Sequence, residues 1–90
     1  MEFEWDPQKA ATNLRKHGVS FADAASVFVD PLAYTFSDPD HSMGESRWIT
    51  FGKSEGRLLL VVAHVERGRR IRIISAREAT RHERKIYEQG

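Results

Sequence analysis

A chain of 90 residues has room for a single hydrophobic core, so we expect one domain spanning residues 1–90. Hydrophobic residues make up 40% of the chain and charged residues 30%, a balance that excludes an intrinsically disordered chain. The sequence has no cysteine, which excludes disulfides and thiolate chemistry and favours a reducing, cytoplasmic location. Its apolar runs are too short to span a membrane, and the N-terminus does not resemble a signal peptide.

The charge of the chain is divided unevenly between its two halves. Residues 1–45 contain three basic and eight acidic residues, whereas residues 46–90 contain eleven basic and five acidic residues. Most of the basic residues in the second half are arginine, whose planar fork binds phosphate through two hydrogen bonds. Two interpretations stay open, namely solvated arginine faces or an anionic partner, above all the phosphates of a nucleic acid.

The first half predicts a short strand followed by two helices. Asp6 and Pro7 have the residue types of an N-cap and a first helical position, and Gly18 can end the helix in the left-handed conformation. Ser20 is the expected N-cap of the second helix. The predicted elements are a strand in residues 1–5 and helices in residues 8–17 and 21–29.

The second half predicts four strands and a final helix. The segment 57–66 is apolar on both faces, which indicates a central strand with both of its faces covered by other elements. The predicted elements are strands at 33–36, 45–52, 57–66 and 69–76, a polar loop at 37–45 and a helix at 77–88. The order β-α-α-β-β-β-β-α predicts an α+β domain, with a small antiparallel sheet, two N-terminal helices and one C-terminal helix.

The last hairpin allows two registers. A two-residue loop would place His64 opposite Ile71, whereas a three-residue loop would place it opposite Arg72. We prefer the three-residue loop, because it keeps Arg70 and Arg72 away from the core and burying arginines is costly. This register predicts that His64 and Arg72 lie side by side on one face.

No nucleotide-binding, metalloprotease or serine-hydrolase motif occurs, and the histidines lack metal-ligand spacing, so we expect no cofactor and no metal. The abundant arginine, histidine and glutamate suit metal-independent cleavage of RNA. This reaction needs a base for the 2′-hydroxyl, an acid for the leaving 5′-oxygen and cations around the phosphate. The candidate catalytic residues are His64, Arg67, Arg72, Arg77 and Glu83, and the candidate RNA-binding residues are Arg70, Arg84, Lys16, His17 and Tyr87.

Structural roles are open for the same side chains. His64 could be a hydrogen-bonded residue at a strand end, and Arg72 could form an ion pair. Arg77 could pair with a neighbouring glutamate, and Glu83 could either orient an arginine or act as a base. Lys16 and His17 could simply complement the dipole of the first helix.

Three stretches of the sequence resemble one known family. The first is F-x-W-D-x-x-K-x-x-x-N-x-x-K-H-G-V-x-F-x-x-A, from Phe3 to Ala24. The second is E-x-R-W, from Glu45 to Trp48, and the third is R-I-I-S-A-R-x-A-T-x-x-E-R-x-x-Y, from Arg72 to Tyr87. Together they are similar to the BrnT toxins of bacterial type II toxin–antitoxin systems.

The resemblance implies a RelE-like fold and metal-independent RNA cleavage that inhibits translation. It also implies neutralisation by a DNA-binding antitoxin similar to BrnA, with autoregulation of the operon and a dimer within the toxin–antitoxin complex. A non-catalytic nucleic-acid-binding module, such as a degenerate toxin retained for operon control, is the alternative, and a domain that only dimerises is a third. RNA cleavage in EDTA would separate the first hypothesis from the others.

Overall fold

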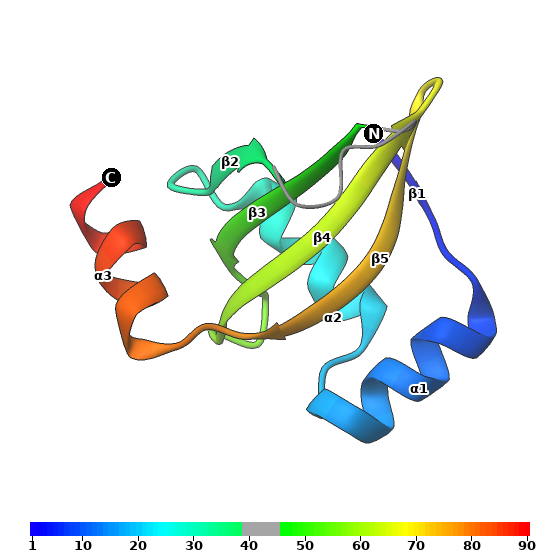
Figure 1. The fold of residues 1–90 in the computed structure, drawn as a ribbon, viewed down its shortest axis with the longest axis horizontal. Coiled ribbons are helices and arrows are strands. Elements are labelled where there is room, and N and C mark those ends of the chain that lie inside the picture. The colour runs from blue at the N-terminus through cyan, green and yellow to red at the C-terminus, as the bar shows by residue number, and fades with distance from the viewer. Residues whose placement is uncertain (39–45) are drawn as a thin grey trace.

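The structure, a computed structural model, describes residues 1–38 and 46–90. The predicted α+β class and element order are confirmed (Figure 1). The elements are β1 (Glu2–Glu4), α1 (Pro7–His17), α2 (Phe21–Ala25), a 3-10 helix η1 (Ser26–Val29), β2 (Tyr34–Ser37), β3 (Arg47–Lys53), β4 (Leu59–Arg67), β5 (Arg70–Glu78) and α3 (Arg81–Gln89). No helix in this described part is long and apolar enough to cross a membrane. The predicted loop at 37–45 and the start of the following strand fall largely outside the described residues.

The sheet has the strand order β1-β5-β4-β3-β2, so the apolar strand β4 is central, as predicted. Strands β2 to β5 pair antiparallel, but β1 pairs parallel to β5. The expectation of an antiparallel sheet is therefore wrong for β1, whose three residues align with the first three residues of β5. Glu4 stands beside Arg72 in this pairing and forms an ion pair with it at 2.9 Å, and this ion pair stabilises the parallel contact.

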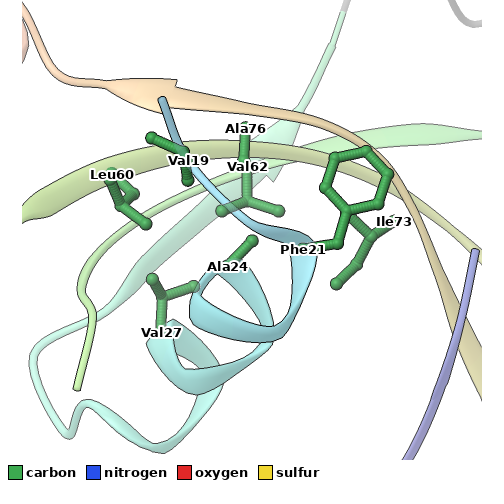
Figure 2. Packing of buried hydrophobic residues seen from close by; sticks show 8 residues of the cluster. All are labelled: Val19, Phe21, Ala24, Val27, Leu60, Val62, Ile73 and Ala76. Carbon is green, nitrogen blue, oxygen red and sulfur yellow. The ribbon is translucent and has the colours of Figure 1, made fainter. Parts of the chain in front are cut away.

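The helices α1 and α2 and the 3-10 helix η1 pack on one face of the sheet, which we call the helix face. The core on this face joins α2 and η1 to β4 and β5 (Figure 2) through Val19, Phe21, Ala24, Val27, Leu60, Val62, Ile73 and Ala76. The second helix was predicted to continue to residue 29, but α2 ends at Ala25 and the chain tightens into η1. Phe21 and Ala24 of α2 and Val27 of η1 are buried in this core.

The opposite face, which we call the open face, is covered by the described residues only at one end, where α3 packs (Figure 1). Tyr87 of α3 is buried against Phe51, Leu59 and Val61. We expected this helix to begin at Arg77, but Thr80 is its N-cap and β5 continues to Glu78. The capping box in which Thr80 participates fixes this later start.

The hairpin between β4 and β5 has a two-residue turn, Gly68-Arg69, and pairs Arg67 with Arg70. Neither register considered from the sequence occurs: His64 lies opposite Ile73, not Ile71 or Arg72. Gly68 has φ +62°, and a glycine with positive φ suits such a tight turn. The preference for a three-residue loop was wrong because the turn begins one residue later than assumed.

A register shift next to Ala63 and His64 changes which side chains of β5 share a face. Ala63 pairs with Ser75 and His64 with Ile73, so Ile74 is the extra residue of a β-bulge. In a regular strand Arg72 and Arg77, five residues apart, would point to opposite faces. The bulge brings both onto the open face.

Gly18 ends α1 with φ +71°, and its N–H donates to the carbonyl of Leu14 at 2.9 Å. No atom lies within 4 Å of the position that a Cβ would occupy, so a substitution there meets backbone strain and no clash. We expect Gly18→Val to lower the free energy of unfolding by about 1–2 kcal/mol, measured by urea denaturation. Gly18→Asn should cost clearly less, because asparagine tolerates this conformation. Equal losses for the two variants would contradict this explanation.

Candidate functional site

The open face carries most of the arginines of the sheet. The register of β3, β4 and β5 places five of them on this face, namely Arg47, Arg67, Arg70, Arg72 and Arg77. Arg47 and Arg72 flank the buried Val65 in one row across the three strands. Positive side chains are therefore concentrated where no helix covers the sheet, apart from the end occupied by α3.

A hollow of about 340 Å³ lies on this face. Its apolar floor is formed by Ile49, Val61 and Ala63, from β3 and β4. Polar side chains from four elements or their ends surround the floor: His17, Asp38, Arg47, Ser75 and Arg77. The Nε of Arg47 is buried and has no hydrogen-bond partner among the described residues. An apolar floor bordered by guanidinium groups suits a nucleotide, whose base can pack on apolar side chains and whose phosphate needs cations.

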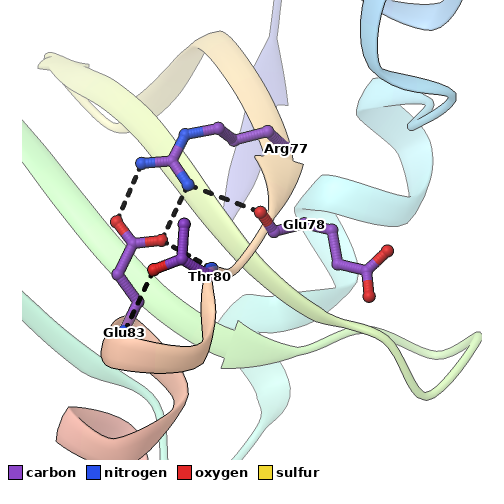
Figure 3. Close-up of polar contacts among 4 residues, drawn as sticks. All are labelled: Arg77, Glu78, Thr80 and Glu83. Carbon is purple, nitrogen blue, oxygen red and sulfur yellow. Dashed lines mark hydrogen bonds and ion pairs between the residues drawn. The ribbon is translucent and has the colours of Figure 1, made fainter.

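Arg77 is held by two hydrogen bonds to Glu83 (Figure 3). Its Nη1 donates to Oε1 at 2.7 Å and its Nη2 donates to Oε2 at 2.8 Å. The hydrogen bonds from Arg77 lower the pKa of Glu83 to about 2, and the same contact raises the pKa of Arg77. A carboxylate with so low a pKa is a poor proton acceptor near neutrality. The geometry thus favours the orienting role for Glu83 over the role of base.

Glu83 also accepts a hydrogen bond from the N–H of Thr80 at 2.9 Å, so its carboxylate serves both the cap and the ion pair. We expect Glu83→Gln, which can keep the cap, to cost about 0.5–1.5 kcal/mol of unfolding free energy, and Glu83→Ala about 1 kcal/mol more. Urea denaturation measures both, with Glu88→Gln on the exposed side of α3 as the control. If the two Glu83 variants lose the same stability, the cap contributes nothing.

Arg72 and Arg70 reach towards β1. Arg72 donates to Oε2 of Glu4 at 2.9 Å, and Arg70 approaches Oε1 at 3.5 Å. The hydrogen bond from Arg72 lowers the pKa of Glu4. The structural role that the sequence left open for Arg72, an ion pair, is thus present in the structure, and Arg72 lies on the same face as the hollow.

His64 is not part of the arginine cluster. Its register places it on the helix face, where it is 4% exposed and its ring packs edge-on against Phe28. Its Nε2 lies 2.7 Å from Oγ1 of Thr50, and burial lowers the pKa of His64 to about 4. The prediction that His64 stands beside Arg72 failed because it depended on the wrong hairpin register. A buried, neutral imidazole behind the sheet cannot contact RNA on the open face.

His17 reaches the hollow because α1 is fastened to β5. The amide of Asn13, one turn earlier in α1, donates to the carbonyl of Ala76 at 2.8 Å and accepts from its N–H at 3.1 Å. Residues four apart share one side of a helix, so the side that holds Asn13 against the sheet edge also carries His17. Ala76 directly precedes Arg77, which explains why His17 and Arg77 border the same hollow.

The remaining predicted RNA-binding residues are more scattered. Lys16 is exposed and borders a second hollow on the other side of His17. Arg84 is half-buried on α3. Tyr87 is 9% exposed and its hydroxyl donates to Asp30 at 2.6 Å, and burial together with this bond raises its pKa to about 12. These contacts show that Tyr87 fastens α3 to the body of the domain.

Sequence reasoning missed three residues at or near the hollow: Arg47, Asp38 and Asn13. The available signal for Arg47 was its position in β3, where Arg47, Ile49 and Phe51 occupy every second residue. Within residues 1–38 and 46–90, no group of three or more histidine, aspartate or glutamate side chains could hold a metal ion.

Together, the mixed five-stranded sheet, the helices α1, α2 and η1 on one face and an arginine-bordered hollow on the other are typical of a small α+β domain that acts on nucleic acid. Residues 5–83 match the family model for the ribonuclease toxin BrnT of type II toxin–antitoxin systems. The chain belongs to this BrnT family of ribonuclease toxins.

A solved structure agrees with this assignment. The crystal structure of the Brucella abortus ribonuclease toxin BrnT is similar, with a TM-score of 0.68 and 28% sequence identity, over 90% of this chain and 99% of that chain. No match was found among curated protein sequences. The resemblance seen in the three sequence motifs is therefore confirmed.

Proposed function

We propose that this chain is a metal-independent endoribonuclease whose active site is the hollow on the open face. The observation that carries the proposal is the convergence of Arg47, Arg77 and His17 around an apolar floor. In this reaction the 2′-oxygen attacks the adjacent phosphorus, the bond to the 5′-oxygen breaks, and the products carry a 2′,3′-cyclic phosphate and a 5′-hydroxyl. Arginines stabilise the charge that develops on the phosphate.

Two arginines at the hollow supply positive charge for the phosphate, and neighbouring arginines extend this positive surface. Arg77 is oriented by Glu83, and Arg47 borders the hollow from β3. Arg67, Arg70 and Arg72 continue the positive surface along the β4–β5 hairpin and would bind phosphates beyond the cleaved one. Single-stranded RNA fits this arrangement best, because a base can lie on the floor only when it is unpaired.

The wild-type protein tests the proposal directly. Incubated in EDTA with an end-labelled single-stranded RNA, it should produce fragments ending in a 2′,3′-cyclic phosphate. An all-DNA strand of the same sequence should stay intact, because it lacks the 2′-hydroxyl. Salt-dependent binding of RNA without cleavage would instead support the non-catalytic regulatory module.

We further propose that RNA cleavage inhibits translation and that an antitoxin similar to BrnA blocks the open face. A partner segment with acidic side chains would complement the arginines electrostatically. Induction of this chain should arrest growth, and co-expression of the adjacent antitoxin gene should relieve the arrest. An antitoxin that binds only the acidic N-terminal half, away from the hollow, would contradict this part of the proposal.

A further inference from the structure

We propose that His17 is the general acid of the cleavage reaction, the group that protonates the leaving 5′-oxygen. This inference rests on the proposed ribonuclease function and adds a role that the geometry of α1 and β5 supports. His17 is exposed at the end of α1, and it borders the hollow together with Arg77.

The chemistry of the groups around the hollow leaves few candidates for this role. Among residues 1–38 and 46–90, the titratable or charged side chains that line it are His17, Asp38, Arg47 and Arg77. Arginine keeps its protons in proteins, so Arg47 and Arg77 can stabilise charge but cannot donate a proton to the alkoxide. Aspartate is normally a carboxylate near neutral pH, so it can accept a proton but has none to donate. Histidine is the side chain that exchanges a proton in this range.

The placement of His17 is fixed by the fold. The three hydrogen bonds of the buried Asn13 amide, to Val19 and to both backbone groups of Ala76, hold the last turn of α1 against β5. The end of a helix also favours a cationic side chain, since its carbonyl groups carry partial negative charge. The imidazole of His17 therefore borders the same hollow as the arginine that would hold the phosphate.

The 2′-oxygen forms its bond to phosphorus and its proton passes to a water molecule in the open hollow. The bond between phosphorus and the 5′-oxygen breaks, and that oxygen takes the proton from the His17 imidazolium. His17 is left neutral and regains a proton from water. The arginines remain charged throughout.

A substrate with sulfur in place of the bridging 5′-oxygen tests this role, because a thiolate leaves without being protonated. We compare the wild type, His17→Gln and the control His82→Gln, which changes an exposed histidine of α3, on both substrates in EDTA. On ordinary RNA, His17→Gln should cleave about 100-fold more slowly or worse, and His82→Gln should match the wild type. On the sulfur substrate, the defect of His17→Gln should shrink to about fivefold or less.

The dependence of the cleavage rate on pH gives a second test of the acid role of His17. The wild-type rate should fall on the alkaline side of the histidine range, and His17→Gln should lack this limb. His17 lines two hollows, and the charged groups that border either of them shape this alkaline limb. These groups are Asp6, Lys9, Lys16, Asp38, Arg47 and Arg77.

Each outcome decides between the hypotheses. An equal defect of His17→Gln on both substrates would overturn the acid role and assign His17 to binding or structure. Cleavage at the wild-type rate by His17→Gln would also overturn it, while leaving the ribonuclease proposal intact. If the wild type cleaves neither substrate, the proposed function itself fails.

Discussion

Asn13→Leu should lower the free energy of unfolding by about 2–4 kcal/mol, although the two side chains have the same branching and the same number of heavy atoms. The change leaves the N–H and carbonyl of Ala76 and the carbonyl of Val19 without the partner that Asn13 provides. Each buried polar group that loses its hydrogen bond costs about 1–3 kcal/mol. Urea denaturation at neutral pH measures the loss.

A control on the same helix makes the comparison specific. Gln8→Ala changes an exposed residue of the first turn and should stay within about 0.5 kcal/mol of the wild type. A loss below about 1 kcal/mol for Asn13→Leu would show that water replaces the amide and that α1 is not fastened through this residue.

Acidification from pH 6.5 to pH 4 should cost about 3 kcal/mol through His64 alone. Burial lowers the pKa of His64 from 6.5 to about 4 in the folded protein. Between these values the unfolded chain binds a proton that the folded chain does not, so stability falls as the pH falls, by about 1.4 kcal/mol per unit. Glu83, whose pKa is lowered to about 2, adds a loss only below its ordinary pKa of 4.5.

The slope of unfolding free energy against pH, measured between pH 5 and 6.5, isolates the histidine. His64→Gln can keep a hydrogen bond to Thr50 but does not titrate. Its slope should therefore be smaller than that of the wild type by up to about 1.4 kcal/mol per pH unit, which corresponds to one bound proton. His82→Gln, on the exposed side of α3, should leave the slope unchanged. A His64→Gln variant with the wild-type slope would place the titrating group elsewhere.

The local signals in the sequence predicted most of the fold. Asp6 and Ser20 cap their helices as expected, with accepted hydrogen bonds from Gln8 and Asp23, and Gly18 takes the left-handed conformation. These features depend on neighbours within a few residues, which a sequence displays directly. The buried strand β4 was equally clear, because its apolar residues are continuous on both faces.

The site was harder to predict because it depends on register. A turn shifted by one residue placed Arg72 on the face opposite to His64, and the bulge at Ile74 turned Arg77 towards the hollow. Neither event leaves a distinct mark in a single sequence. The contact of Asn13 with Ala76 spans 63 residues of chain, so the approach of His17 to Arg77 could not be derived from helix periodicity alone. The family resemblance identified the class of protein without locating these contacts.

Cleavage of RNA on the open face should depend strongly on Arg47, so Arg47→Ala is a decisive variant. Arg47 borders the hollow, and none of the hydrogen bonds that hold α1 or α3 in place involves its side chain. The measurement is kcat/KM for a single-stranded RNA in EDTA, with Arg15→Ala on the exposed surface of α1 as the control. We predict a loss of about 100-fold for Arg47→Ala and none for Arg15→Ala. Wild-type cleavage by a folded Arg47→Ala protein would contradict the claim.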